Sequence, residues 1–307
     1  MPEWLAIGLA VVALLGFIVL AYASLIERNW YHVREVSLRV LPAGSEPIRV
    51  LHLSDFHFRG NQRKKKRWLS SLSNLKPDLV VNTGDNLGAR NSVLGLEEAL
   101  KSLSQTPGVF VNGSNDYTGP SFRNPFAYLS GPSEPASGIQ LETDELEAAF
   151  ERLGWQNLNN RNARMVVAGQ QLDLIGVDDP HIGRADFTEA VKGLAAAPVA
   201  STDMRPTLRI GLAHAPYLDV LNKFAELDAN LVFAGHTHGG QVCLPGGRAL
   251  VTNCDLPPKN AKGVSAWQFG ERTLVLHVCA GLGTSVLAPF RLFCPPEVAL
   301  VELLPTT

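Results

Sequence analysis

The sequence predicts an α/β domain behind one N-terminal apolar helix, and three observations support this prediction. The chain has 307 residues, of which 46% are hydrophobic and 18% charged, which is typical of globular proteins. From residue 48 onward, short apolar runs alternate with polar stretches of helical spacing, as in α/β sheets. Residues 4–26 contain no charge. The net charge of −2 gives no basic excess, so no nucleic-acid partner is expected.

The N-terminal run WLAIGLAVVALLGFIVLAYASLI, residues 4–26, predicts a membrane anchor. At about 1.5 Å rise per residue its helix would measure roughly 34 Å, against about 30 Å of hydrocarbon in a bilayer. The AYA at 21–23 resembles a signal-peptidase site. However, the run is long for a signal peptide, and the segment before it carries Glu3 and no Lys or Arg. We therefore expect the anchor to be retained.

The orientation of the anchor is predicted from the basic residues beside it. No Lys or Arg precedes the run, whereas Arg28, Arg34 and Arg39 follow it. By the positive-inside rule the C-terminal domain faces the cytoplasm, which gives a single-pass cell-membrane protein. The basic run RKKKR at 63–67 predicts either a solvated helix face or a contact with anionic lipid heads.

We expect three parts in the chain: a transmembrane anchor at 1–27, a juxtamembrane connection at 28–47 and one domain at 48–307. REVSLRV within the connection could form a first strand. The strands expected after it are 48–55, 77–85, 108–116, 163–169, 172–179, 208–216 and 229–240, and the expected helices are 62–75, 93–104 and 145–154. The Pro-, Gly- and Ser-rich stretch 118–142 predicts a long loop.

Polar side chains cluster where the predicted strands end. They are Asp55, His57, Asp85, Ser114, Asn115, Asp116, His214, His236 and His238. Carboxylate, imidazole and amide groups of this kind bind Mn²⁺, Fe²⁺ or Zn²⁺. A spacing of two lets both side chains of each DxH or HxH pair point the same way on an extended segment. The glycines around the second pair, in AGHTHGG, allow the chain to turn there. The pattern predicts a shared metal site.

The motifs DFH, GDN, GSND, AHAP and GHTHGGQ, in this order, resemble those of the calcineurin-like metallophosphoesterases. The closing segment GLGTSVLAPFRLFCPPEVALVEL resembles the membrane-associated bacterial branch of that family. The resemblance covers about residues 48–304. It implies a four-layer α/β/β/α sandwich and a metal-dependent phosphoric ester hydrolase that favours diesters over monoesters. With the anchor, it suggests a substrate near the membrane, such as a lipid or envelope-precursor phosphoester.

The resemblance also implies roles for individual residues. By position, it gives a first metal held by Asp55, His57 and His238, a second held by His214, His236 and the amide of the third motif, and Asp85 as the bridge between them. In such a centre two divalent ions (Mn, Fe or Zn) lower the pKa of a bridging water. The resulting hydroxide attacks phosphorus in line, and the metals offset the charge that develops.

The third motif departs from the family pattern. Where Gly-Asn-His-Asp is usual, this chain has Gly113, Ser114, Asn115 and Asp116. We expect Asn115 to reach the metal through a shifted loop, with Ser114 or a water as alternatives, and Asp116 to hold the loop. No histidine stands at the leaving-group position. Either His181 supplies the proton, or the substrates have leaving groups that depart without one.

A non-catalytic, phosphate-binding or regulatory domain is the competing function, because the altered motif could impair turnover. The intact remaining ligand set argues against such decay. Two arginines, Arg59 and Arg291, could bind a substrate phosphate or pair with a surface carboxylate. His52 is expected in the core or behind the ligands, and Asp179 in a turn before Pro180. The four cysteines form no CxxC pair, so a zinc knuckle is not expected.

Overall fold

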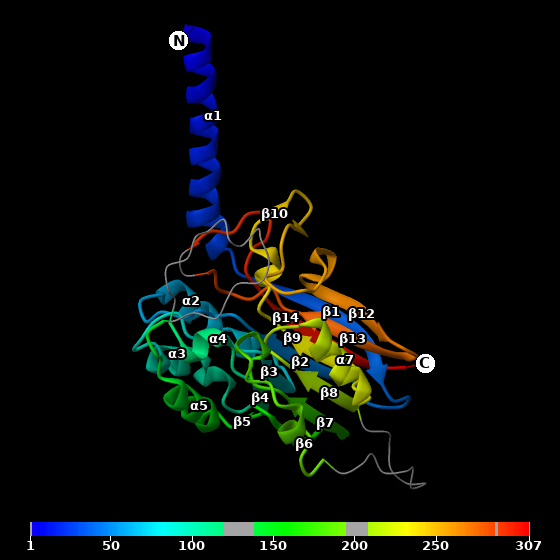
Figure 1. The fold of residues 1–307 in the computed structure, drawn as a ribbon. Coiled ribbons are helices and arrows are strands. Elements are labelled where there is room, and N and C mark those ends of the chain that lie inside the picture. The colour runs from blue at the N-terminus through cyan, green and yellow to red at the C-terminus, as the bar shows by residue number, and fades with distance from the viewer. Residues whose placement is uncertain (1, 120–137, 195–207, 286–287, 307) are drawn as a thin grey trace.

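The computed structural model describes residues 2–119, 138–194, 208–285 and 288–306. Two six-stranded sheets pack face to face, and helices cover the outer face of each. The four layers α/β/β/α are therefore confirmed, as is the apolar N-terminal helix, which projects away from the sandwich (Figure 1).

The first sheet has the order β1-β14-β2-β3-β4-β5. Its strands are β1 (His32–Leu41), β14 (Glu297–Pro305), β2 (Ile48–Leu53), β3 (Leu79–Asn82), β4 (Gly108–Phe110) and β5 (Trp155–Asn157). β14 runs antiparallel to β2 and parallel to β1, while β2 to β5 are parallel to one another. Because β1 pairs with β14 over its length, half of the segment 28–47 forms the edge of this sheet.

The second sheet has the order β12-β13-β9-β8-β7-β6. Its strands are β12 (Gly263–Phe269), β13 (Arg272–Val278), β9 (Leu231–Ala234), β8 (Leu208–Leu212), β7 (Gln170–Gly176) and β6 (Arg161–Val167). An antiparallel hairpin lies at each edge, and the strands between them are parallel. A small hairpin of β10 (Cys243–Leu244) and β11 (Arg248–Ala249) lies near the foot of the N-terminal helix (Figure 1).

The helices pack against the sheets through apolar stripes. They are α2 (Arg63–Ser70), α3 (Val93–Leu100) and α5 (Thr143–Arg152) on the first sheet, α6 (Phe187–Ala190) and α7 (Leu218–Glu226) on the second, and the short α4 (Ser114–Tyr117) at a strand end. The layer between the sheets is apolar, with residues such as Val50, Val81 and Ile210 fully buried. Burial of this kind contributes about 25 cal/mol per Å² of apolar surface.

The structure refines two expected helices and adds a third. The helices expected over 62–75 and 93–104 are shorter, because 3₁₀ turns at Leu72–Leu75 and Lys101–Leu103 follow α2 and α3. The sequence analysis missed α7, although its buried Val220, Leu221 and Phe224 have helical spacing. Residues 120–137 of the expected loop lie outside the described residues.

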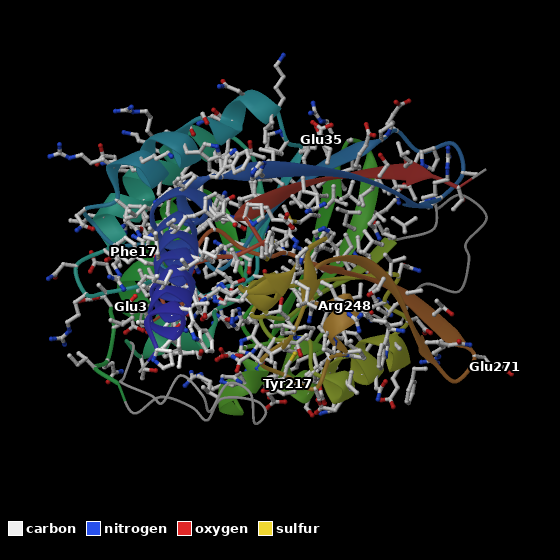
Figure 2. The ribbon with its side chains drawn as sticks, turned by 90° about the horizontal axis from the view of Figure 1, so that it is seen from above. Glu3, Phe17, Glu35, Tyr217, Arg248 and Glu271 are labelled. Atoms are coloured by element: carbon white, nitrogen blue, oxygen red, sulfur yellow. The ribbon has the colours of Figure 1, made fainter. Side chains whose placement is uncertain are left out.

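The N-terminal helix α1 (Glu3–Ala21) continues through a π-turn (Tyr22–Ile26) and a 3₁₀ turn (Glu27–Asn29). This helical segment, Glu3–Asn29, is long and apolar enough to cross a bilayer, and its apolar stretch is not buried against the domain. Its foot is attached to the loop before β14: Ala23 O accepts a hydrogen bond from Arg291 N at 3.1 Å, and Glu27 accepts one from Cys294 N at 2.6 Å. Seen from above, α1 stands over the side of the domain that carries α2 (Figure 2).

Candidate metal centre

The candidate site residues follow the ends of four strands, two from each sheet. Asp55 and His57 follow β2, Asp85 follows β3, His214 follows β8, and His236 and His238 follow β9. All six are buried. Because the carboxyl ends of parallel strands meet at one edge of each sheet, facing the sheets against each other brings the two sets together. The six side chains therefore converge at one rim, and metal binding by them stays a prediction.

The backbone at these positions is left-handed. The φ angles of Asp55, His57, Asp85, His236 and His238 lie between 40° and 69°. Left-handed conformation is uncommon for residues other than glycine, and such strain collects at functional sites. In the turn AGHTHGG, the backbone of Gly235 also lies very close to Ser54: a Cβ on Gly235 would lie 1.9 Å from Ser54 Oγ. Glycine there lets the two strand ends meet.

The first group of ligand-type atoms comes from Asp55, His57 and His238, and these atoms lie within 4.8 Å of one another. The Nε2 atoms of His57 and His238 are 3.1 Å apart, and His238 Nε2 is 3.8 Å from Asp55 Oδ1. The Nδ1 of His57 is buried with no hydrogen-bond partner in the part of the chain that the structure describes. Imidazole nitrogens and a carboxylate that converge in this way are suited to a divalent cation.

The second group combines Asp55, Asp85 and His214, again within 4.8 Å. His214 Nε2 lies 3.5 Å from Asp85 Oδ1, and His57 Nε2 lies 3.5 Å from Asp85 Oδ2. His236 Nδ1 is 3.3 Å from His214 Nε2. The two groups share Asp55, and Asp85 contacts a histidine of each, so the residues could hold two cations close together.

The histidine tautomers follow from the carbonyl groups behind them. His214 Nδ1 is 2.7 Å from Thr83 O, and His236 Nε2 is 3.1 Å from Asn253 O. A carbonyl only accepts, so each of these nitrogens carries the proton, which leaves His236 Nδ1 as a lone pair facing the cluster. Backbone carbonyls behind metal-binding histidines orient the rings in many metalloproteins.

Burial and neighbouring charges shift the pKa values in the cluster. Burial, assisted by Lys65, lowers the pKa of His57 to about 4, and burial holds the pKa values of His236 and His238 well below the usual range. The three rings are therefore neutral, as metal ligands must be. Burial, together with the charge of Asp85, raises the pKa of Asp55 to about 6 despite the opposing charge of His214.

Asp85 and His214 form an ion pair between the two sheets. Burial by itself would raise the pKa of Asp85 and lower that of His214. Their mutual attraction outweighs burial, so the pKa of His214 lies well above its usual range and that of Asp85 well below. Binding a cation at these atoms would displace the proton of His214.

The third motif lies beside Asp85. Asn115 donates its backbone N–H to Asp85 Oδ1 at 2.8 Å and its amide to Oδ2 at 2.7 Å, and Ser114 Oγ is 3.5 Å from the same amide. Asp116 accepts hydrogen bonds from the backbone N–H groups of Gly113, Asn86 and Leu87. The expectation that Asp116 holds this loop is confirmed, and Asn115 is brought to the cluster by the start of α4.

His181 also lies at the edge of the cluster. Its ring centroid is 4.6 Å from that of His236, and its Nδ1 is 2.8 Å from the hydroxyl of Tyr217. Asp179 caps the 3₁₀ turn Pro180–Ile182 by accepting from His181 N, as the turn prediction requires. Its other oxygen, Oδ2, is buried without a partner among the described residues.

Sequence reasoning missed several groups that support the cluster. Ser54 donates to Asp55 Oδ2 at 2.6 Å and accepts from the hydroxyl of Thr83, which bonds to His52 Nε2. His52 is thus both in the core and behind a ligand, as expected. The position of Ser54, next to the first carboxylate, was the available signal, but a serine next to an aspartate is common.

Both expectations for Arg291 are wrong. The side chain is fully buried and donates to backbone carbonyls, among them those of Gly283, His238 and Ala280. Its guanidinium ties the loop before β14 to the HxH turn, so it meets neither a surface carboxylate nor solvent. A five-donor group surrounded by carbonyl oxygens is satisfied without an anion.

Comparison with known proteins identifies the family to which the sequence belongs. Residues 48–240 match the family model described as Calcineurin-like phosphoesterase. The metallophosphoesterase YkuE of Bacillus subtilis is 24% identical over 92% of this chain and 88% of the relative. The phosphodiesterase YaeI of Escherichia coli is 25% identical over 92% of each chain. LpxG of Chlamydia trachomatis, a UDP-2,3-diacylglucosamine pyrophosphatase, is 25% identical over 84% of each. A family match over more than half of the sequence, with its motifs gathered in one buried cluster, shows that this chain belongs to the calcineurin-like phosphoesterase family.

Proposed function

We propose that the chain is a phosphodiesterase that uses two divalent cations and acts at the membrane surface. Family membership makes it a metal-dependent phosphoester hydrolase. The observation that carries the two-metal proposal is the position of Asp85 between two groups of ligand atoms: Oδ2 lies 3.5 Å from His57 Nε2 of one group, and Oδ1 lies 3.5 Å from His214 Nε2 of the other. The relatives named as a phosphodiesterase and as a pyrophosphatase favour diester or anhydride substrates over monoesters.

The residues present fit a metal pair. The proposed assignment is Asp55, His57 and His238 to one cation, His214, His236 and Asn115 to the other, and Asp85 to both. Neutral imidazoles, buried carboxylates and an amide are ligands of borderline divalent cations. When bound, such a pair polarises phosphoryl oxygens and lowers the pKa of a coordinated water.

The chain's own residues would orient the reaction. The left-handed turns fix the ligand atoms on the rim, and the hydrogen bonds from Asn115 to both oxygens of Asp85 hold that carboxylate in place. Rigid positioning of this kind contributes more to rate than additional binding does. Asn115 therefore acts in our proposal as a ligand and as a positioning group for Asp85.

His181 is our candidate for protonating the leaving group. It lies against His236, and its Nδ1 bonds to Tyr217. A general acid is worth about 10²–10⁴-fold with a poor leaving group and little with a good one. His181→Ala should therefore slow hydrolysis of an alkyl phosphodiester far more than that of bis(p-nitrophenyl) phosphate. Equal effects on the two substrates would exclude His181 as the acid.

The membrane setting comes from α1 and its flanks. The helical segment through Asn29 suits a single span, and three arginines follow α1, which supports a cytoplasmic domain. The foot of α1 is bonded to Arg291, whose guanidinium bonds to His238 O, so the cluster lies close to the bilayer surface. A lipid or envelope-precursor phosphoester fits this position, in keeping with the lipid substrate named for LpxG.

The competing function is a phosphate-binding domain without turnover, favoured by the absence of a histidine in the third motif. The deciding experiment is hydrolysis of bis(p-nitrophenyl) phosphate by the full chain in neutral detergent with Mn²⁺. We expect metal-dependent turnover that disappears with a chelator and in His236→Ala. Turnover no higher than in that variant would favour the binding domain.

A further inference from the structure

A pocket lies at the junction of the membrane helix and the candidate metal centre. Its cavity volume is about 60 Å³, and it is partly open to solvent. Its wall combines the foot of α1 with the loop after β2 and the N-terminal half of α2. Arg28 and Tyr31 come from the membrane side, Lys65 from α2, and His57 from the metal cluster. One cavity therefore touches both the membrane-proximal segment and a metal ligand.

The lining of this pocket is cationic. Arg28, Arg59 and Lys65 line it, together with uncharged hydrogen-bonding groups such as Gln62 and Thr284. No Asp or Glu is among the described residues that line it, and neither Arg28 nor Lys65 has a carboxylate partner in the described part of the chain. The like charges of Arg28 and Lys65 at one recess repel each other, so an anion inside it would be favourable.

The environment of Lys65 contains cations and no described carboxylate. Only 3% of the residue is exposed, and its Nζ donates to Phe56 O at 2.7 Å. An ammonium group has three donors, so this one bond leaves two for a ligand. Burial, then the charges of Arg291, Arg28 and Arg59, lower the pKa of Lys65 to about 7. Burial among cations destabilises the charged form of this lysine, and an anion in the pocket would stabilise it.

The position of the pocket indicates where the anion comes from. Arg28 lies at the end of the candidate span, where lipid headgroups begin, and its Nη1 is held by Pro289 O at 2.8 Å. Tyr31 of the wall packs on Trp68 of α2 with ring centroids 5.4 Å apart, so an aromatic pair lies beside the pocket. Aromatic and basic residues of this kind are typical of headgroup depth.

We propose that this pocket binds a phosphate group carried by a membrane lipid, next to the phosphorus that reacts at the metals. The binding itself needs no metal, whereas the suggestion that the lipid is the substrate rests on the proposed function. A substrate with two phosphoryl groups would then place one at the pocket and the other at the cluster, since His57 borders both.

The test measures phosphate binding to the full chain in neutral detergent after chelator treatment, which removes any metal. Inorganic phosphate is titrated first, by calorimetry, and dioleoylphosphatidic acid in the same micelles second. The variants are Arg28→Gln, Arg28→Lys and Lys65→Met. Matched controls are Arg39→Gln, an exposed arginine that also bonds to a proline carbonyl, and Lys66→Met, the next residue of α2, which pairs with Glu98.

We expect one saturable phosphate site, weakened about tenfold by Arg28→Gln and by Lys65→Met and less than threefold by Arg28→Lys and the controls. Phosphatidic acid should bind more tightly than inorganic phosphate. Equal affinities for the two ligands would contradict the proposal that the phosphate comes from a lipid.

No phosphate binding, or equal effects of Arg28→Gln and Arg39→Gln, would contradict the proposal that this pocket binds phosphate. Arg28 is partly exposed, so its variants should fold, and their phosphate affinity can be measured even if Lys65→Met does not fold. Failed Mn²⁺-dependent hydrolysis would contradict the proposed function without altering this result.

Discussion

Two buried histidine pairs of this protein differ in what surrounds them. His57 and His238 face each other at strand ends, with Nε2 atoms 3.1 Å apart and the carboxylates of Asp55 and Asp85 within 4 Å. His52 and His277 lie deeper, with Nδ1 atoms 2.9 Å apart, and no described carboxylate is paired with either ring. Burial lowers the pKa of all four rings.

The backbone separates the pairs further. His52 and His277 are in regular register within β2 and β13, whereas His57 and His238 have φ angles of 40° and 50°. A strand residue presents its side chain to a sheet face, and Phe233 packs on both rings of the inner pair. A left-handed turn at the strand end instead aims the ring at the rim. Turns and carboxylates, more than imidazole pairing, therefore define the candidate metal site.

The largest effect is expected from a rim histidine. His236→Ala should lower Mn²⁺-dependent hydrolysis of bis(p-nitrophenyl) phosphate by about 10³-fold, since a catalytic cation supplies several kcal/mol of transition-state stabilisation. Bound metal, measured by elemental analysis, should fall from two equivalents toward one. His32→Ala, on the edge strand β1, is the control and should keep both. Two equivalents retained in His236→Ala would remove this histidine from the ligand set.

A smaller effect is expected one layer behind the ligands. Ser54→Ala removes the 2.6 Å hydrogen bond to Asp55 Oδ2 and ends the connection from His52 to that carboxylate. Loss of such support typically costs about 10–100-fold in metal affinity. Competition with a chelator would measure it. Ser92→Ala, equally buried but bonded to Arg90 O, should change the affinity less than twofold.

The fold was largely predictable because its signals are local. Alternating apolar runs marked β2, β3, β8 and β9, and the polar residues after them marked the rim. The pairing of β1 with β14, which are more than 200 residues apart, leaves no local pattern. Strand order depends on which apolar faces meet, and a single sequence does not carry that information.

Of the candidate site, the sequence predicted the ligand-type residues that converge, but not the groups that support them. Motif spacing identified the Asp and His residues, but Thr83 and Arg291 act through neighbours that only the folded chain supplies. Arg291 illustrates the reason: an arginine in sequence suggests an anion, yet five carbonyl oxygens of one loop and one turn can satisfy it. Burial decides between these outcomes, and burial depends on tertiary packing.

Asp179, beside the candidate site, should make the stability of the protein depend on pH. Burial raises its pKa in the metal-free chain to about 7, from an ordinary 3.8. Between these values the folded chain holds a proton that the unfolded chain releases. The residue therefore lowers stability as pH rises, by at most about 1.4 kcal/mol per pH unit, until pH passes the folded pKa. Asp179→Asn removes this dependence.

Denaturant unfolding with chelator and neutral detergent at pH 5, 6, 7 and 8 would test this. The gain in unfolding free energy of Asp179→Asn over the natural chain should increase from pH 5 to pH 7 and then level off. A gain that is constant, or that increases toward acid, would contradict a raised pKa at this position.

The smallest effect on metal binding is expected from the inner pair. His277→Phe removes a ring whose Nε2 has no partner among the described residues and leaves His52 Nδ1 unpaired. An unpaired buried nitrogen costs about 1–3 kcal/mol, so the free energy of unfolding should fall by that amount. Metal content should stay at two equivalents and the hydrolysis rate within about threefold, because His52 keeps its bond to Thr83. Loss of a metal in His277→Phe would show instead that both pairs act as one unit, and that a buried imidazole contributes to the centre without a carboxylate or a strand-end turn beside it.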